Sequence, residues 1–436
     1  MKKILTIVGI VLLLSFIILG LWYFFTTKKD SGNDGITDDT EQTGNFFPDS
    51  QNGSPTPLFN EDSENDPYQD SSFIPQFRQL SQVPVSGMIS FERLATSSDT
   101  FIDEGNVVST STETVFRYIE RGTGHVFETT ERTITQERIS NITFPQIQKA
   151  LFDSSGDQLF LQFFANDNET IRTFHGEISE ISTTKEDGTE FKDSQLDTIF
   201  FSNNLYDITP SYNNQSVFSV SKNDNGSVIE TTSFETLETK QITPLLLSNW
   251  NIQSPNNILL TLTTKANSEI GGYLYFYDLS TGRKTRILGP LDGLTTNTSP
   301  SGNFVLFSTI RAGKIELYIY NTEDSSVESL VVQTLPEKCI WKESNEIALY
   351  CAVPSVMSRS PLPESWYQGL ASFNDDLWKI TLRDGNTPSY QTILEPSSVT
   401  GKTFDIVDLQ LSPKNEYLLF VNKDDLNLWS FDVTSF

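Results

Sequence analysis

From about Phe73 onward, short apolar or alternating runs are separated by Gly, Asn, Asp and Pro. No stretch in this part of the chain shows the sustained 3.6-residue period of an amphipathic helix. Short apolar runs with turn residues between them are typical of β-strands. The pattern therefore predicts one essentially all-β domain over residues 73–436.

A turn followed by an apolar strand recurs along this domain, most clearly in SPSGNFVLF at 299–307 and SPKNEYLLF at 412–420. A second strand follows each copy, as in LYIYN at 317–321 and LWSFD at 428–432. A further short element comes next, as in TRIL at 285–288. Together with the strand that precedes the turn, the repeat is a four-stranded antiparallel sheet of roughly 45 to 60 residues.

The middle strands of the repeat, such as FVLFSTI and YLLFVNK, are apolar on both faces. A sheet with one wet face would alternate between apolar and polar residues, so these sheets must be covered on both sides. Radial stacking of blades covers both faces and exposes only short edges. The sequence predicts a seven-bladed β-propeller with blades at about 84–140, 145–196, 205–243, 248–288, 292–333, 337–394 and 403–433.

The last predicted blade has three strands, because only three residues follow Val433. The segment Phe77–Leu80 resembles the fourth-strand elements of other blades and precedes a first-strand candidate, SGMISFE. We therefore predict that it completes blade seven and closes the ring. The alternative is that this segment is the unpaired end of a linker.

The turn-plus-strand pattern SPSGNFVLF followed by LYIYN resembles the WD40-like repeats of TolB-type and tricorn-type propellers. The N-terminal propeller of dipeptidyl-peptidase IV-like enzymes has similar repeats. The resemblance covers about residues 145–433 and implies the propeller fold. Those peptidases also carry a hydrolase domain with a Gly-x-Ser-x-Gly elbow, a motif that this sequence does not contain. TolB-type proteins bind partners in the periplasm, which implies a binding role.

Ahead of the domain, Ile4–Phe25 is a run of 22 residues without a charge. As a helix it would be about 33 Å long, enough to cross a hydrocarbon core of about 30 Å. The run is too long for a signal peptide, and no small-x-small cleavage site follows it. We expect residues 1–29 to be an uncleaved single-pass anchor. The short N-terminal tail and the cysteine pair favour an extracytoplasmic domain.

Residues 30–72 are rich in Asp, Ser, Gly, Asn, Thr and Pro, and the part from Asp30 to Asp70 holds 11 acidic residues and no Lys or Arg. A segment of this composition cannot bury enough apolar surface to offset the entropy of ordering. The sequence predicts a disordered acidic linker that tethers the propeller to the membrane.

The composition excludes some functions. The net charge of −27 argues against nucleic-acid binding, which needs clustered Lys and Arg. The two histidines, His125 and His175, lie in strand-like contexts, where a lone histidine is usually structural. No nucleophile motif and no distinct carboxylate pair can be singled out, so we expect that the protein is not an enzyme and has no cofactor. We also expect it to be a monomer.

Cys339 and Cys351 flank the first hairpin of blade six and are equidistant from Asn345, the expected turn centre. Opposed positions in an antiparallel pair lie about 4.5 to 5.5 Å apart, which suits a disulfide. An extracytoplasmic location would allow that bond. Two buried free thiols, or a metal or redox site, are the alternatives.

Loops between the second and third strands are rich in Asp and Asn, as at 166–169, 223–226, 374–376 and 423–425. A propeller brings these loops to one face, where carboxylates can bind calcium. Tight turns need the same residues, and no loop matches an ordered calcium motif, so we predict no metal site.

The corresponding connection in blade six, 354–376, is much longer than the others. Long loops in compact domains are commonly functional. Trp366 and Tyr367 are the candidate partner-binding residues, because aromatic side chains often anchor interfaces. Alternatively, they pack back over the neighbouring blade.

Together these features predict a membrane-tethered, extracytoplasmic β-propeller that acts as a non-catalytic scaffold for an envelope protein or a surface polymer. The alternative is an enzyme that acts on an envelope polysaccharide or peptide at the propeller channel.

Overall fold

The computed structural model describes residues 74–95, 101–103, 106–108, 111–140, 143–184, 190–224, 226–247, 249–344, 346–357, 360–383 and 386–436. They belong to one compact unit, Asp70–Phe436. The predicted anchor Ile4–Phe25 and the predicted linker 30–72 lie outside the described residues. Within the described ranges, no helix has the length and apolar character needed to cross a membrane.

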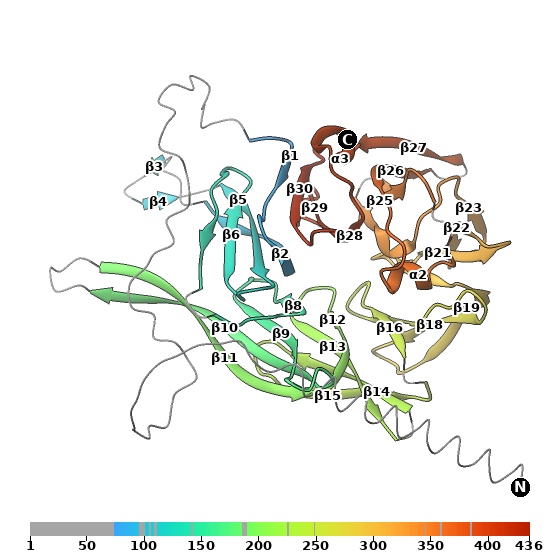
Figure 1. Ribbon diagram of the computed structural model, residues 1–436, viewed down its shortest axis with the longest axis horizontal. Helices are drawn as coiled ribbons and strands as arrows, with labels where there is room; N and C mark the ends of the chain where they lie inside the picture. The colour runs from blue at the N-terminus through green and yellow to red at the C-terminus, as the bar shows by residue number, and fades with distance from the viewer. Residues whose placement is uncertain are drawn as a thin grey trace, which may run out of the picture. The chain divides into compact units, whose positions relative to one another are not determined.

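The strands of this unit form seven four-stranded antiparallel sheets that follow one another around a ring (Figure 1). The predicted all-β, seven-bladed propeller is therefore confirmed. In six sheets the four strands are consecutive in the chain, apart from a small two-stranded ribbon inserted in the first. The repeat is thus one up-and-down sheet, as its apolar runs and turn residues predict.

The first three blades contain the following strands. Blade 1 consists of β2 (Val85–Leu94), β5 (Thr112–Glu120), β6 (Val126–Thr130) and β7 (Glu137–Arg138). Blade 2 consists of β8 (Lys149–Phe152), β9 (Gln158–Phe164), β10 (Ile171–Thr184) and β11 (Glu190–Asn203). Blade 3 consists of β12 (Leu205–Pro210), β13 (Ser216–Asn223), β14 (Gly226–Ser233) and β15 (Thr239–Leu245).

The other four blades have the same plan. Blade 4 consists of β16 (Trp250–Gln253), β17 (Leu259–Thr264), β18 (Gly271–Asp278) and β19 (Lys284–Asp292). Blade 5 consists of β20 (Thr295–Thr298), β21 (Phe304–Arg311), β22 (Lys314–Asn321) and β23 (Val327–Ser329). Blade 6 consists of β24 (Cys339–Glu343), β25 (Ile347–Pro354), β26 (Asp375–Arg383) and β27 (Asn386–Leu394). Blade 7 consists of β28 (Ile406–Leu411), β29 (Tyr417–Asn422), β30 (Leu428–Asp432) and β1 (Phe77–Gln79).

Few described elements lie outside the blades. The ribbon in blade 1 is formed by β3 (Phe101–Asp103) and β4 (Asn106–Val108). The helical segments are η1 (Pro336–Lys338), α2 (Glu364–Tyr367) and α3 (Pro396–Thr400). All three are short, and all three belong to connections in or next to blade 6.

Blade 2 is longer than the sequence pattern indicates, because its fourth strand ends at Asn203 rather than near residue 196. Strands β10 and β11 pair in register from Phe174 with Phe200 out to Thr184 with Glu190, and β9 covers β10 only as far as Glu177. The two strands therefore project as a hairpin beyond the blade (Figure 1). The sequence of this hairpin is mostly polar, so no apolar alternation marks where the strands end.

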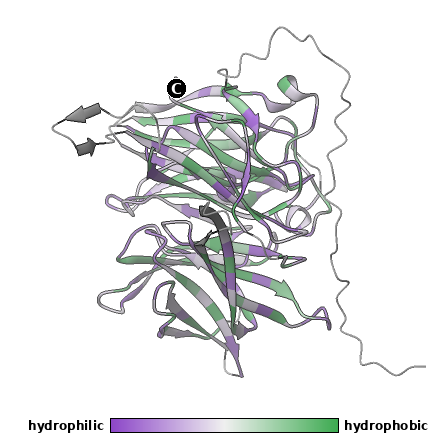
Figure 2. Cartoon of the chain, turned by 90° about the vertical axis from the view of Figure 1, so that its left-hand side faces the viewer, coloured by the Kyte–Doolittle hydropathy of each residue, from purple (hydrophilic) through white to green (hydrophobic). Residues whose placement is uncertain are grey.

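Hydrophobic clusters join every blade to its two neighbours around the ring. In one of them, Phe116 and Tyr118 of blade 1 pack with Leu419 and Leu428 of blade 7. Burying such a side chain contributes about 1.5 to 3 kcal/mol. Figure 2 shows the green apolar positions running through the blades. The core is therefore a ring of interfaces between sheets.

The ring is closed by β1, which pairs antiparallel with β30. Phe77 lies opposite Phe431, and its ring stacks on Trp429 at a centroid distance of 4.9 Å. Beyond the strand, the amide of Leu80 donates to the carbonyl of Leu428 at 2.7 Å. The prediction that Phe77–Leu80 completes blade seven is confirmed.

Two sets of loops share one end of the ring. In an antiparallel blade, the loop between strands two and three lies at the same end as the link to the next blade. We call this end the upper face and the opposite end the lower face. The long connection of blade 6 belongs to the upper face.

Replacing Phe77 with Ala should open the closing blade. The change removes a ring that contacts Phe404, Phe420 and Trp429, and we expect it to lower the free energy of unfolding by about 2 to 4 kcal/mol. Phe164→Ala is the control, because that half-exposed side chain ends β9 away from the closure. Urea unfolding followed by tryptophan fluorescence measures both, and equal losses would contradict the closing role of Phe77.

Candidate binding site

The first strands of the blades surround an axial channel. The channel contains a cavity of about 1190 Å³. Residues of β2, β8, β12, β24 and β28 line this cavity. Each of these strands pairs with the second strand of its own blade, so its other edge faces the axis. The channel wall therefore combines main chain from the inner edges with alternate side chains.

Three strongly charged side chains line this cavity among the described residues: Arg121, Lys149 and Asp408. The Lys149 ammonium donates to the carbonyl of Ile208 at 2.5 Å. Burial lowers the pKa of Lys149, and the nearby carboxylates of Asp207 and Asp408 act in the opposite direction. The charge of Lys149 is thus held in the channel wall without a direct ion pair.

Asp408 lies at an irregularity of the inner strand of blade 7. Val407 pairs with Val421 but Gln410 pairs with Leu419, so β28 carries a bulge at this point. Asp408 has a φ of 52°, in the left-handed region that costs a residue other than glycine on the order of 1 kcal/mol. Burial raises the pKa of Asp408, and Lys149 lowers it. The bulge therefore places a carboxylate in the channel at some cost in backbone energy.

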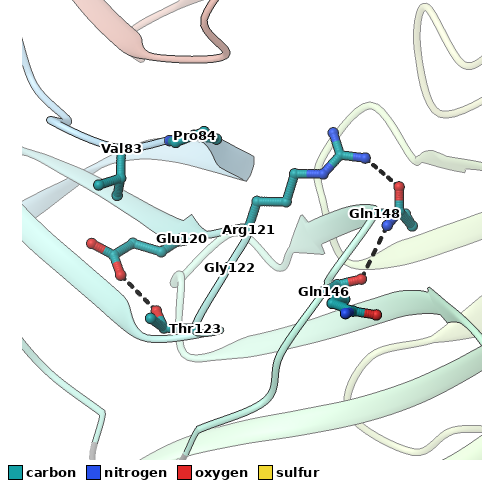
Figure 3. Close-up of a pocket in the computed structure, with 8 residues that line it drawn as sticks. All are labelled: Val83, Pro84, Glu120, Arg121, Gly122, Thr123, Gln146 and Gln148. Atoms are coloured by element: carbon teal, nitrogen blue, oxygen red, sulfur yellow. Dashed lines mark hydrogen bonds between the residues drawn. The ribbon is translucent and has the colours of Figure 1, made fainter. Parts of the chain in front are cut away.

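A second cavity, of about 480 Å³, lies beside the loop that joins β5 to β6 in blade 1 (Figure 3). Its lining includes Glu120, Arg121 and Gln148. The Arg121 guanidinium donates to the side-chain oxygen of Gln148, and the Thr123 hydroxyl donates to Glu120 at 2.5 Å. Figure 3 shows Glu120 turned toward Thr123 and Arg121 turned toward Gln148.

The long connection of blade 6 covers part of the upper face. It carries α2, whose Glu364 accepts from the amide of Ser268 in blade 4. The Tyr367 hydroxyl donates to Glu337, which precedes blade 6. Burial raises the pKa of Glu337, and burial with the nearby Glu337 raises that of Tyr367. The connection therefore links blade 6 to blade 4 across blade 5.

The two predicted partner-binding residues have different environments. Trp366 is buried, with 6% of its surface exposed, and packs in a cluster with Ile315 and Leu335. Tyr367 is 46% exposed. Of the two alternatives, packing back over the neighbouring blade therefore describes Trp366. Tyr367 remains accessible.

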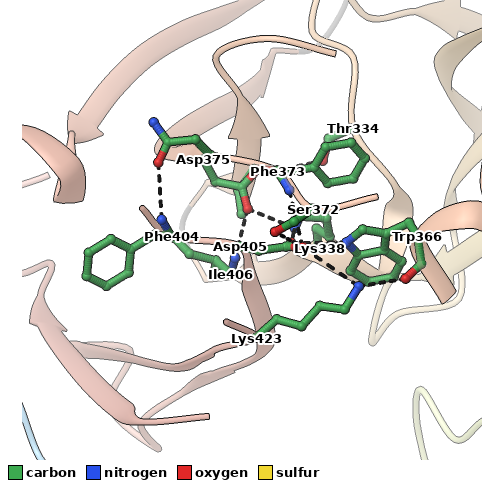
Figure 4. A network of polar contacts seen from close by, with 12 residues as sticks. Thr334, Lys338, Trp366, Ser372, Phe373, Asp375, Phe404, Asp405, Ile406 and Lys423 are labelled. Atoms are coloured by element: carbon green, nitrogen blue, oxygen red, sulfur yellow. Dashed lines mark hydrogen bonds and ion pairs between the residues drawn. The ribbon is translucent and has the colours of Figure 1, made fainter. Parts of the chain in front are cut away.

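A buried polar network fixes this connection from below (Figure 4). Lys338 has no exposed surface, and its ammonium lies 2.8 Å from Asp375 and 2.5 Å from Asp405. The Trp366 indole NH donates to both oxygens of Asp405, at 3.0 and 2.9 Å. The Lys423 ammonium donates to the carbonyl of Trp366 at 2.6 Å. Two lysines therefore balance two carboxylates, which is what allows these charges to be buried.

Asp375 is the member of the network whose hydrogen bonding is incomplete. Burial raises its pKa to about 6, against the opposing effect of Lys338. One of its oxygens accepts from the amide of Ile406 at 2.8 Å, and the other has no partner within the described structure. A protonated Asp375 would leave Lys338 paired with Asp405.

Cys339 and Cys351 occupy opposed positions of β24 and β25, and their sulfur atoms are bonded at 2.11 Å. Both residues are buried between blades 5 and 6. The turn centre Asn345 lies outside the described residues. The structure therefore has the pairing that the symmetric spacing predicts.

The remaining candidates are engaged in local contacts. Asp167 accepts from the amide and the hydroxyl of Thr170, and these bonds lower its pKa to about 2. His175 is buried against Phe160, and burial lowers its pKa; burial also lowers that of His125. In the described part of the chain, no three His, Cys, Asp or Glu residues gather closely enough to hold a metal ion.

Sequence reasoning missed Lys149, Asp408 and Arg121 as channel residues. A lysine at the start of a first strand and an arginine after a second strand look like ordinary surface charges, and no motif marks a bulge at Asp408. Only Lys149 could have been found from the sequence. It is the single charged residue of the apolar run KALF at 149–152, which is a first strand and so faces the axis.

We expect the buried charge of Asp375 to make folding depend on pH. Its folded-state pKa lies above the unfolded value of 3.8, so its contribution to stability is complete below about pH 4 and is lost as the pH rises through about 6. Relative to Asp375→Asn, the unmodified chain should lose about 2 to 3 kcal/mol between pH 4 and pH 7. Urea unfolding at both pH values measures the difference.

Glu323→Gln is the matched control, because it removes an exposed carboxylate of blade 5. This variant should follow the unmodified chain at both pH values. The same pH dependence in the Asp375→Asn variant as in the unmodified chain would show that Asp375 is not the group responsible.

Comparisons with known proteins concern the fold. No family model and no curated protein matches the sequence. Among solved structures, TolB from Acinetobacter baumannii is 10% identical with a TM-score of 0.37, covering 72% of this chain and 61% of that one. The propeller domain of the Trilobed protease from Pyrococcus furiosus is 10% identical with a TM-score of 0.44, covering 74% and 92%. The tricorn protease is 10% identical with a TM-score of 0.42, covering 73% and 32%.

This chain thus spans less than two thirds of that TolB and about a third of the tricorn protease. At such identities and TM-scores, no site residue or activity passes from those proteins to this one. The seven sheets themselves carry the fold assignment. In fold, the chain is similar to TolB-type and tricorn-type propellers.

Proposed function

We propose that this chain is a membrane-tethered, extracytoplasmic β-propeller that acts as a non-catalytic binding scaffold of the cell envelope. Its partner would be an envelope protein or a surface polymer. The binding site would be the channel, together with the adjoining cavity of blade 1. This proposal combines the propeller with the apolar segment Ile4–Phe25 and the acidic linker that precede it.

The chemistry of the channel lining supports binding without catalysis. Asp408 is the one carboxylate among the described residues that line the cavity, and no histidine or cysteine accompanies it there. Hydrolysis of a glycosidic bond normally needs two carboxyl groups on either side of the bond. Nucleophilic catalysis needs a nucleophile next to a base. The channel lining offers hydrogen bonds and two cations, which can hold a ligand. In the adjoining cavity of blade 1, Glu120 accepts from the Thr123 hydroxyl.

The extracytoplasmic location is supported by the disulfide between Cys339 and Cys351. Disulfides persist in oxidising compartments and are rare in the cytosol. The net charge of −27 suits a soluble domain that must not associate with itself.

Site-specific photo-crosslinking in cells tests the scaffold role. Val83 lines the cavity of blade 1 and is 39% exposed, so a photo-reactive amino acid at this position should give a discrete adduct. Ile258, 63% exposed on the lower face, is the control and should give none. Mass spectrometry of the adduct identifies the partner. Equal adducts at both positions, or cleavage of an envelope polymer by the purified chain, would contradict a non-catalytic scaffold.

The topology is tested by a protease site inserted between Gly53 and Ser54 of the predicted linker. Protease added to intact cells, with any outer membrane made permeable, should release the whole propeller into the medium. The same site in a cytoplasmic reporter should stay uncut. Cleavage of the linker only after cell lysis would place the propeller in the cytoplasm and overturn this part of the proposal.

A further inference from the structure

The two cavities adjoin each other, and we call them together the groove. Arg121 and Gln148 line both the cavity of blade 1 and the axial channel, so these side chains mark the junction. The Arg121 guanidinium thus lies between the cavity of blade 1 and the channel of about 1190 Å³. An elongated molecule fits this shape better than a compact one.

The two cations of the groove have different surroundings. Arg121 pairs with an amide oxygen of Gln148, and in the described part of the chain it forms no ion pair. Lys149 donates to a main-chain carbonyl and likewise forms no ion pair there. The sequence has 57 acidic and 30 basic residues, so a cation without a carboxylate partner is unexpected. Arg121 therefore favours an anionic group on the ligand, whereas Lys149 already lies near the carboxylates of Asp207 and Asp408.

The cavity of blade 1 also holds the Glu120 carboxylate, which accepts from the Thr123 hydroxyl. The lining of the axial channel suits a neutral body rich in hydroxyl groups. Ser90, Thr209 and Gln410 provide uncharged hydrogen-bonding groups, and Tyr212, which is 54% exposed, provides an aromatic ring. Hydroxyls of a sugar can exchange hydrogen bonds with such side chains, and the C–H face of a sugar ring packs on an aromatic ring. Asp408 would accept from hydroxyls but would repel a second anion placed beside it.

We propose that the groove binds an acidic oligosaccharide that carries few carboxylates, with a uronic acid carboxylate at Arg121 and neutral sugars extending past Lys149 into the channel. This inference rests on the proposed scaffold role, because it names the class of surface polymer that the scaffold would hold. Arg121 can meet a carboxylate with two parallel N–H groups, which a lysine cannot do.

Isothermal titration of the full chain in mild detergent, at low salt, tests the proposal with two matched probes. Aldotetrauronic acid is a xylotriose that carries one glucuronic acid, and xylotetraose is its neutral counterpart. We expect the acid to bind at least tenfold more tightly than the neutral sugar, and the difference to shrink as salt screens the charge. Arg121→Gln should abolish the preference, because a charge-assisted bond is replaced by a neutral one.

Arg283→Gln is the control, since Arg283 is an exposed arginine in a lower-face turn of blade 4. It should keep the preference for the acid. Lys149→Gln should change binding of the acid and of xylotetraose alike, because neutral sugars would lie beside Lys149 in both. Unfolding curves of each variant establish that the fold is intact.

Four results would overturn the proposal: no binding of the acid, equal binding of both sugars, an unchanged preference in Arg121→Gln, or tighter binding of an N-acetylated tetraserine with a free carboxylate. The last would point to a peptide ligand. A protein adduct at Val83 together with no sugar binding would reject this inference and keep the scaffold role. Binding of the acid followed by its cleavage would keep the ligand class and reject the non-catalytic role.

Discussion

Each blade is a thin sheet with two apolar faces, and this constraint governs the whole molecule. One sheet cannot bury both faces by itself, so every blade depends on the two beside it. Seven interfaces meet this need only when the ring is complete. The pairing of Phe77–Gln79 with β30 therefore matters to all seven blades, although it involves three residues on each side. Loss of one interface would expose two apolar faces to water at once.

Within this frame, the connection of blade 6 is held by charge. Lys338, Asp375 and Asp405 have no exposed surface, and their desolvation offsets much of their mutual attraction. Such a network contributes less to stability than to geometry, because removing one partner leaves an uncompensated buried charge. Here the geometry is specific, since Asp405 accepts from Trp366 and from the amide of Phe373 on the same connection. The network thereby sets where α2 lies on the upper face.

Much of the fold was predictable because the repeat is local. The turn and strand at 412–420 can be recognised from a few residues, and the spacing of such copies gives the number of blades. The disulfide pairing also follows from local spacing around a hairpin turn. The strand Phe77–Gln79 was predictable only through its likeness to other fourth strands. The extent of β11 was not, because most of the projecting hairpin is polar and carries no apolar alternation.

The site was far less predictable, because it depends on side chains from different blades. Arg121, Lys149 and Asp408 come from blades 1, 2 and 7, and no spacing in the sequence indicates that they share a channel. Trp366 shows the opposite problem, since a tryptophan in a long loop suggests a surface anchor. Its burial depends on the acceptor Asp405, which lies 39 residues further along the chain.

Ring closure also determines the order of events in folding. The Gln76 side chain donates to the carbonyl of Asp432, across 356 positions of sequence. During synthesis, β1 emerges first and must stay without its partner until β30 has been made. Contacts between residues so distant form slowly, because a long loop must close first. Until then the first and last blades each expose an apolar face, and the outer edge of β30 is open to strands of other chains. The slowest and most aggregation-prone stage of folding should therefore be the interval between synthesis of β30 and the docking of β1.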